Sequence, residues 1–570
     1  MGNTLEHFFT GKYFVIPNYQ RDYAWETDNI DDLIDDILES IETSTSHYIG
    51  TFILANTKVK QQFNVVDGQQ RLTSLTMLLS ISIKELATEK DKIIFENKFI
   101  KSNDIRKLQL LNDNNGYLQK LLDGEKPEPK TKSQQLLIKS YEEIEQRVKL
   151  LKGTPVESNF LDSIKQLDVM EFIESDDGKA IRIFQTVNDR GKPLSNMDKA
   201  KSLLIYYSNR FLNGNLDDFI NNQFGKIFHH FTEIQTTGDK FAIDIIRNRK
   251  FSEDSIMRYH FLAYAEDLYD YKATEDYVLN NYLKLTLKSI KSDRVELEKF
   301  IKDYVTDLEV FFESLVSIVR KVQKKEKYYK LFSILGLSTF LYPLIIRLES
   351  LGILDKQIDQ SRKLIFLDLI EIADLRVYKI RGSDPARDVS ILSQSAKTIT
   401  EKEIKDGLIQ FIKKFMTDSD FLIRLNNVAI YPNVGLKHIL IEYDQHLLNR
   451  AYTINELINL NNISPTIEHI FAEEERFDFP NFGFNSQEEY NDKIQYIGNL
   501  TILEKGINSQ CSEKNPNQKI NDNLYEKSKF EGPKQISAKI KNRGTSFVEN
   551  DITLRGKELS DFCLRRWPIV

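Results

Sequence analysis

Cysteine is scarce in this sequence, which contains two, Cys511 and Cys563, among 570 residues. Two thiols cannot supply the ligands of a cysteine-built zinc ribbon within one chain. So low a content is also typical of proteins from a reducing compartment, and we therefore expect a cytoplasmic protein.

Long hydrophobic runs are lacking as well. No apolar stretch reaches the roughly 18–20 residues that a membrane-spanning helix needs, and the first residues lack the order of basic, apolar and small residues that marks a secretory signal. The sequence therefore predicts no membrane association.

The net charge of −7 gives no overall basic character, so binding to nucleic acid would depend on local patches.

The remaining composition is that of a globular protein, with 41% hydrophobic and 29% charged residues. At roughly 100–200 residues per domain, the chain is too long for one core. Short strand-like runs (YFVIP, YIGTFILA, FNVV) near the start predict an α+β unit, and a long helical segment follows it. Towards the end, short apolar runs return among Asn, Gly and Pro residues and predict a second, small α+β domain.

The phosphate-loop pattern G-x-x-x-x-G-K-[ST] is missing too, so a Walker-type phosphate loop is excluded. A different polar turn occurs in FNVVDGQQRLTSLTMLL, residues 63–79. This segment begins as an apolar run typical of a buried strand and continues with leucines at helical spacing from Leu72. The turn would lie at a helix N-terminus, where unpaired N–H groups attract anions.

Side chains of this turn suit a nucleotide. Arg71 would present a guanidinium fork to phosphate oxygens, Asp67 would hold a metal or a ribose hydroxyl, and Gln69 or Gln70 would orient a water. The alternative is an ordinary turn in which Asp67 caps the helix and Arg71 is solvated. The residues alone leave both interpretations open.

Two further polar segments accompany the turn. IPNYQRDYAWE, residues 16–26, contains Gln20 and Arg21 among aromatic residues, which favours either a binding segment or an aromatic core with a surface arginine. IFQTVNDRGKPLSNMDKAKSLL, residues 183–204, contains Ser195 and Asp198 at the spacing of a helix capping box. Capping does not explain Arg190.

These three segments, in this order, resemble the N-terminal domain of GmrSD-type restriction proteins over residues 5–205. The resemblance implies a ParB/sulfiredoxin-like nucleotide-binding fold in which the D-G-Q-Q-R motif takes part in nucleoside triphosphate hydrolysis. It does not distinguish GTP, ATP, CTP and UTP. The nucleotide-binding residues that it implies are Asp67, Gly68, Gln69, Gln70, Arg71, Gln20 and Arg21, with Arg190 as a phosphate contact.

A second constellation lies near the end of the chain. SPTIEHIFAEEE, residues 464–475, contains His469, and YIGNLTILEKGINSQCSEKNPNQK, residues 496–519, contains Asn499 and Asn508. A histidine followed by two asparagines, across a hairpin and into a helix, is what a one-metal phosphodiesterase requires: an imidazole takes a proton from water while a divalent cation polarises the phosphate. The alternative is a structural histidine.

This constellation resembles the HNH (His-Me finger) nuclease at the C-terminus of the GmrSD family. The resemblance implies that His469 is the general base, that Asn499 pins the loop between the strands, and that Asn508 and Glu468 bind Mg²⁺ or Mn²⁺. Lys514 and Lys519 would contact phosphate. The family often has a proline after the His-Ile-x step, where this sequence has Phe471-Ala472.

We therefore expect an α+β, mostly helical protein with a ParB/sulfiredoxin-like nucleotide-binding domain over 1–210, a helical linking domain over 211–428 and a ββα-metal HNH nuclease domain over 429–570. The expected function is that of an NTP-hydrolysing, divalent-metal-dependent endonuclease that restricts phage or modified DNA. Alternatives are a non-cutting, nucleotide-gated DNA- or protein-binding regulator with a degenerate nuclease domain, and a nuclease that cuts RNA. Homo-oligomer formation is left open.

Overall fold

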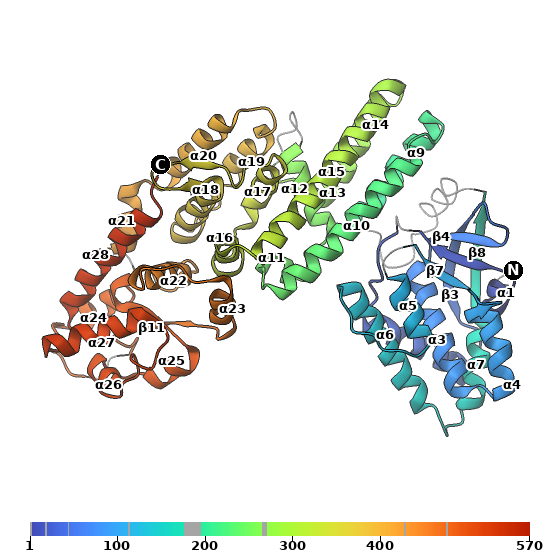
Figure 1. Ribbon diagram of the computed structural model, residues 1–570, viewed down its shortest axis with the longest axis horizontal. Coiled ribbons are helices and arrows are strands. Elements are labelled where there is room, and N and C mark those ends of the chain that lie inside the picture. Colours follow the sequence, from blue (N-terminus) through green and yellow to red (C-terminus); the bar gives the residue numbers. More distant parts are fainter. Residues whose placement is uncertain are drawn as a thin grey trace. The chain divides into compact units, whose positions relative to one another are not determined.

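The computed structural model forms two compact units (Figure 1). It describes residues 3–17, 20–43, 45–111, 114–175, 195–264, 271–426, 429–474 and 477–569. Unit 1 comprises Met1–Thr236, Ser252–Arg258 and Ala273–Glu313; unit 2 comprises Thr237–Phe251, Tyr259–Lys272 and Ser314–Val570. The helical segment expected over 211–428 is thus divided between the two units. The fold class is α+β and mostly helical, as predicted.

Unit 1 contains a six-stranded mixed sheet with the strand order β1-β8-β3-β4-β2-β7. Strands β4, β2 and β7 are parallel to one another, whereas β3 runs antiparallel to β4. The carboxyl ends of the three parallel strands therefore meet at one edge, which is where open α/β sheets bind ligands. The strands are β1 (Asn3–Thr4), β8 (Asp168–Glu174), β3 (Tyr48–Asn56), β4 (Gln62–Asp67), β2 (Tyr13–Ile16) and β7 (Leu108–Leu110).

Helix α3 is the centre of the unit 1 core. It begins directly after β4, and Leu72, Leu75 and Leu79 are fully buried, so the strand–turn–helix predicted from the sequence is confirmed. Helices α5, α6 and α7 pack against it. The helices of this unit include α1 (Leu5–Phe9), α2 (Thr27–Thr43), α3 (Gln69–Leu86), α4 (Glu89–Phe95), α5 (Asn115–Leu122), α6 (Lys132–Leu150), α7 (Glu157–Gln166), α9 (Asn196–Leu212) and α14 (Lys284–Ile290).

Unit 2 is built from helices around one two-stranded hairpin, β11 (Thr466–His469) and β12 (Leu500–Leu503), together with a second short strand pair, β9 (Gln357–Asp359) and β10 (Leu364–Ile365). Three helices cross the division between the units along the chain: α10 (Asp217–Lys240), α12 (Glu253–Tyr264) and α15 (Arg294–Val322). Other helices of unit 2 are α17 (Tyr342–Ser350), α18 (Phe366–Ala373), α19 (Ala386–Ser395), α20 (Glu401–Phe415), α21 (Asp418–Asn426), α22 (Leu436–Leu447), α23 (Ile454–Asn462), α24 (Gln487–Lys493), α25 (Lys505–Cys511), α26 (Pro516–Asn521), α27 (Glu531–Arg543) and α28 (Glu549–Arg566).

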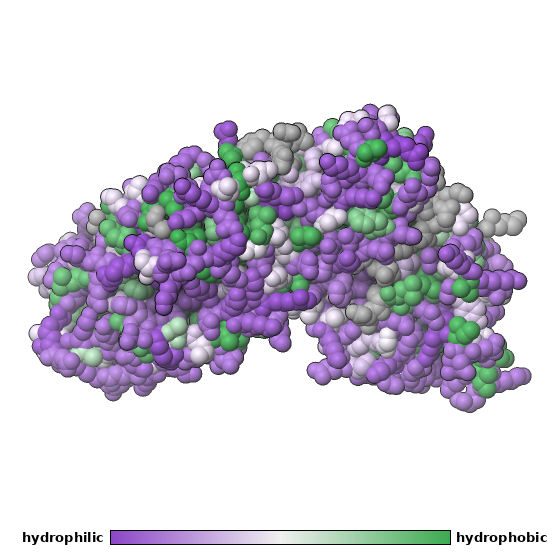
Figure 2. Space-filling view, turned by 45° about the horizontal axis from the view of Figure 1, so that its top comes forward, coloured by the Kyte–Doolittle hydropathy of each residue, from purple (hydrophilic) through white to green (hydrophobic). Residues whose placement is uncertain are grey.

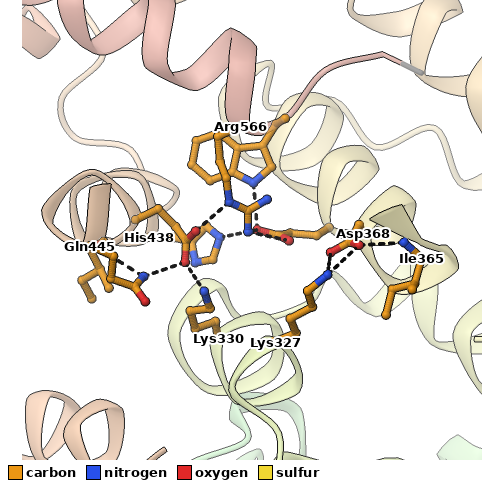
Figure 3. Close-up of polar contacts among 11 residues, drawn as sticks. Lys327, Lys330, Ile365, Asp368, His438, Gln445 and Arg566 are labelled. Atoms are coloured by element: carbon orange, nitrogen blue, oxygen red, sulfur yellow. Dashed lines mark hydrogen bonds and ion pairs between the residues drawn. The ribbon is translucent and has the colours of Figure 1, made fainter. Parts of the chain in front are cut away.

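A buried ion network fixes the end of α28 (Figure 3). The Arg566 guanidinium donates to Glu371 and Glu442, and the neighbouring Trp567 indole N–H donates to Glu371 Oε1 at 2.7 Å. His438 Nε2 lies 2.8 Å from the same Glu371 oxygen. Burial by itself would raise the pKa of Glu442, but the facing cations hold it at about 2. The network therefore keeps both carboxylates ionised and anchors the last helix in the core.

Helix α28 also packs on the core that surrounds the β11–β12 hairpin. Ile552, Leu559, Phe562 and Trp567 are all buried, and Ile552 belongs to the core cluster that surrounds the hairpin. The view in Figure 2 shows a mostly hydrophilic surface with apolar residues in small groups. In the part of the chain that the structure describes, no helix combines the length and hydrophobicity needed to cross a bilayer.

Candidate functional site

The turn between β4 and α3 requires a glycine. Gly68 has a φ of +88°, and a Cβ on it would lie 2.5 Å from Phe52 Cδ1. Both the left-handed backbone and the close approach exclude larger residues. The turn thus places Asp67 at the carboxyl end of β4 and Arg71 in the first turn of α3.

Arg71 folds back over strand β3. Its Nη1 donates to the Thr51 carbonyl oxygen at 3.2 Å, and its guanidinium lies 5.6 Å from the centroid of the Phe52 ring. Gly50 makes this possible, because a Cβ there would lie 2.5 Å from Arg71 Nη1. Sequence reasoning missed Gly50; a glycine inside a strand was the available signal, since it often marks a close approach.

The electrostatics of this turn suit an anion. Burial lowers the pKa of Arg71 and raises the pKa of Asp67, and their mutual attraction opposes both shifts. No carboxylate of the described ranges lies within ion-pair distance of the Arg71 guanidinium. A partly desolvated guanidinium beside a helix N-terminus therefore retains capacity for a bound phosphate.

Two predicted glutamines hold the loop after β2 in place. Gln20 Nε2 donates to the Val66 carbonyl oxygen at 3.1 Å. The Gln70 amide accepts from Ala24 N at 2.8 Å and donates to the Asp22 carbonyl oxygen at 3.1 Å. The expectation that Gln70 orients a water is therefore corrected, because both ends of its amide bind backbone.

Arg21 joins the first and third motifs. Its Nη2 donates to Ser195 Oγ at 3.1 Å and forms an ion pair with Asp198. Ser195 is the N-cap of α9 and accepts from Asp198 N, so the predicted capping interaction is confirmed. The described geometry thus brings all three motifs of the N-terminal resemblance together, while Arg190 lies outside the described residues.

In unit 2, His469 ends β11 opposite Leu500 of β12. Its Nε2 lies 2.9 Å from Gln495 Oε1, and Gln495 Nε2 donates to Glu473 Oε1 at 3.0 Å. The imidazole and the Tyr431 ring make a T-shaped contact, with the centroids 4.6 Å apart. These contacts hold the His469 side chain in place, and the residue remains 8% exposed.

Asn499 clamps the turn that follows His469. Its Nδ2 donates to the carbonyl oxygens of Phe471 and Ile494 at 2.9 and 2.8 Å, and its Oδ1 accepts from Phe471 N at 2.8 Å. Its backbone oxygen also accepts from Ile470 N at 2.8 Å. The side chain is fully buried, so Asn499 fixes the chain around the histidine and does not face solvent.

A buried arginine supports the same turn from α28. Arg555 Nη1 donates to the carbonyl oxygens of Gly498 and Leu500 at 2.9 and 2.7 Å. Gly498 is required here, because a Cβ on it would lie 1.8 Å from the Ile552 carbonyl oxygen. No local pattern in the sequence marks Arg555, because its carbonyl partners are more than fifty residues away.

The position of Lys519 differs from the prediction and also affects the role predicted for Glu468. Its ammonium is completely buried and binds Glu468 Oε1 at 2.7 Å and the carbonyl oxygens of His469 and Ile470 at 2.6 and 3.1 Å. A phosphate cannot reach it, so the expected phosphate contact is wrong. The Glu468 carboxylate, predicted to bind a metal, is instead neutralised by this lysine inside the core.

Of the two predicted metal ligands, Glu468 is not free to bind a cation in this arrangement, because its carboxylate pairs with Lys519. Asn508 Nδ2 donates to Thr466 Oγ1 and to the Ile467 carbonyl oxygen at 2.7 and 2.9 Å, at the start of β11. Thr466 and Ile467 precede His469 by three and two residues, about 10 and 7 Å along the strand at about 3.3 Å per residue. Among the described residues, no three His, Cys, Asp or Glu side chains form a group that could hold a metal.

Lys514 is the predicted phosphate contact that stays at the surface. Its ammonium pairs with Asp522 at 2.8 Å, and its side chain is 37% exposed. A surface ion pair of this kind is worth little and can be exchanged for another anion. Contact of Lys514 with phosphate stays a prediction.

Two protein-family models match the sequence. The model described as the N-terminal domain of the GmrSD restriction endonuclease matches residues 5–205. The model described as the C-terminal domain of GmrSD restriction endonucleases matches residues 415–562. The two matches together cover more than half of the chain. No curated protein is significantly similar to it.

Proposed function

Because the chain belongs to the GmrSD family of restriction endonucleases, we propose that it has two catalytic centres, an NTP-hydrolysing centre in unit 1 and an HNH-type DNA nuclease centre in unit 2. Family membership makes DNA the substrate. The finer proposal is that the protein acts in the cytoplasm on phage or modified DNA, which it nicks or cuts.

The nuclease proposal is carried by one observation, the clamped imidazole at the end of β11. Asn499 and Arg555 immobilise the adjoining turn, so His469 presents its ring at a fixed place beside the hairpin. In the proposed reaction His469 takes a proton from water, the water oxygen attacks phosphorus, and the phosphorus–oxygen bond to the leaving strand end breaks. The resemblance adds Mg²⁺ or Mn²⁺ as cofactor, and the described residues assign no ligand set to it.

The NTPase proposal is supported by the Gly68 turn. The triphosphate would lie at the N-terminus of α3, with Arg71 on its oxygens and Asp67 towards the ribose or a magnesium-bound water. Gln69 is the remaining glutamine for orienting water, since Gln70 is bound to backbone at both ends.

Plasmid cleavage tests the nuclease centre. Supercoiled plasmid and matched modified and unmodified phage DNA are incubated with Mg²⁺ or Mn²⁺, with and without each NTP. We expect His469→Ala to abolish cleavage, whereas the exposed control His446→Ala cleaves like the parent. Unchanged cleavage by His469→Ala would refute the assignment of the nuclease centre. Cleavage of RNA in preference to DNA would make RNA the substrate of this centre.

Phosphate release tests the nucleotide centre. We expect Arg71→Ala to stop NTP hydrolysis while the fold is kept, because the guanidinium is the cation of the turn. Arg106→Ala is the control, since Arg106 pairs with Asp123 elsewhere in unit 1. Release at the parental rate by Arg71→Ala would contradict the proposal.

A non-cutting regulator is the second candidate function. It is favoured by the buried Lys519–Glu468 pair, which occupies a carboxylate that the resemblance assigns to metal binding. This candidate predicts DNA binding that depends on NTP, with no cleavage of any substrate in the presence of any divalent metal.

A further inference from the structure

We propose that Gln495 is a positioning residue that fixes the tautomer of His469, so that Nδ1 is the atom that accepts the proton from water. This inference rests on the proposed nuclease function and adds a residue to it. It follows from the chain of hydrogen bonds Glu473–Gln495–His469, in which the direction of each bond can be assigned from chemistry.

The carboxylate at one end sets the orientation of the amide. An ionised carboxylate only accepts hydrogen bonds, so the Gln495 atom that lies 3.0 Å from Glu473 Oε1 must be the amide nitrogen. The amide oxygen then faces the imidazole. The usual ambiguity between the oxygen and nitrogen of a glutamine side chain is therefore removed here.

The amide in turn sets the imidazole. The Gln495 Oε1 atom only accepts, so His469 Nε2, at 2.9 Å, must carry a proton and donate it. A neutral imidazole protonated on Nε2 has its lone pair on Nδ1. No residue of the described ranges is a hydrogen-bond partner of Nδ1, so the lone pair remains available to a water.

The surroundings keep the ring in this orientation. The Tyr431 ring meets the imidazole edge to face, at an interplanar angle of 81°. The backbone oxygen of His469 accepts from Lys519 at 2.6 Å. The residue is thus held at its backbone, by the ring contact with Tyr431 and at Nε2, and among the described residues nothing occupies Nδ1, the nitrogen that the reaction needs.

Gln495 has a second, structural role that the test must separate. Its backbone oxygen accepts from Ile430 N and Tyr431 N at 3.0 and 3.3 Å. Substitutions of the side chain leave these two bonds available. A change in catalysis without a change in fold therefore reports on the amide and not on the backbone contacts.

The experiment measures kcat and KM for plasmid nicking by the full chain. We expect Gln495→Met to lower kcat at least tenfold with KM changed less than twofold, because the ring loses its acceptor and both tautomers are populated. In Gln495→Glu combined with Glu473→Gln, the acceptor is restored. We expect kcat of this double variant to be higher than that of Gln495→Met. We also expect the acid limb of its pH profile to lie about one unit higher than that of the single variant Glu473→Gln, because a carboxylate at Nε2 favours the imidazolium. Gln510→Glu makes the same charge change at an exposed site and serves as the control.

The outcomes separate this inference from the nuclease proposal. If His469→Ala is inactive but Gln495→Met keeps the parental kcat, the tautomer inference is overturned and the nuclease centre stands. If His469→Ala cleaves like the parent, the nuclease assignment itself fails. Should Gln495→Met fail to fold, as judged by its melting temperature, the double variant decides, and an acid limb that does not move overturns the inference.

Discussion

The ammonium of Lys519 and the carboxylate of Glu468 lie 2.7 Å apart and are both closed to solvent. Two backbone carbonyl oxygens, of His469 and Ile470, complete the contacts of the lysine. Burial raises the pKa of Glu468, and Lys519 opposes the shift. The pair therefore stabilises the strand end that carries the proposed general base.

Removing the cation leaves a buried carboxylate without a partner. We expect Lys519→Met to lower the free energy of unfolding of unit 2 by roughly 3–5 kcal/mol, and Glu468→Gln in the same chain to recover part of the loss. Of the two tryptophans, Trp25 and Trp567, the latter reports on unit 2, so urea unfolding is followed by fluorescence in a Trp25→Phe background. Lys514→Met, at the surface, is expected to change little. Equal effects of the two lysine variants would contradict the buried pair.

Gly50 keeps the space that the Arg71 guanidinium occupies. We expect Gly50→Ala to weaken NTP binding at least tenfold, because its Cβ would lie 2.5 Å from Arg71 Nη1. Gly153→Ala is a matched control: Gly153 also has a positive φ, of +79°, but no atom lies within 4 Å of its added Cβ. Both variants lose stability from backbone strain, and only the first is expected to lose nucleotide in a binding titration. Parallel loss in both would show that strain alone is responsible.

Asn499 makes three side-chain hydrogen bonds inside the core. We expect Asn499→Ala to destabilise unit 2 by about 2–4 kcal/mol, since it leaves buried backbone groups of Phe471 and Ile494 unpaired. The same fluorescence-detected unfolding measures it, and Asn491→Ala, at an exposed position, is the control. If Asn499→Ala lost less free energy of unfolding than the control, Asn499 would not be the residue that holds the turn.

Asp374 gives unit 2 a pH-dependent stability. Burial raises its pKa to about 6, against the partial opposition of Lys379 and Ser338. The folded state holds the Asp374 proton more tightly than the unfolded state. Protonation of Asp374 therefore stabilises the folded state fully below pH 3.8, and this contribution is lost as the pH rises through about 6. We expect Asp374→Asn to remove the dependence and to be more stable than the parent at pH 7 by roughly 2–3 kcal/mol.

Unfolding midpoints of the two chains between pH 4 and pH 7 check this prediction. Asp406→Asn, at an exposed position of α20, controls for the loss of one negative charge. Parallel pH dependence of the parent and Asp374→Asn would show that Asp374 titrates normally.

Several features could be predicted because their causes are local. The switch from strand to helix at Gly68 follows from a change of hydrophobic period within seventeen residues, and the cap of α9 depends on Ser195 and Asp198, three positions apart. The hairpin that carries His469 and Asn499 was visible as two short apolar runs. The first two signals involve residues within one or two turns of chain, whereas the hairpin was visible only as two separate runs whose pairing spans 31 to 37 positions.

The partners of polar side chains were decided only by the tertiary structure. The sequence marks Lys519, Gln70 and Gln495 as polar, and polar residues are usually exposed, yet each binds a group between 26 and 50 positions away. Whether such a group faces solvent, a phosphate or a buried carboxylate depends on which segments the fold brings beside it. The sequence by itself therefore determined the family, the fold class and the positions of the motifs, while packing determined what each charged or amide group can bind, because desolvation and hydrogen-bond geometry exist only in the folded chain.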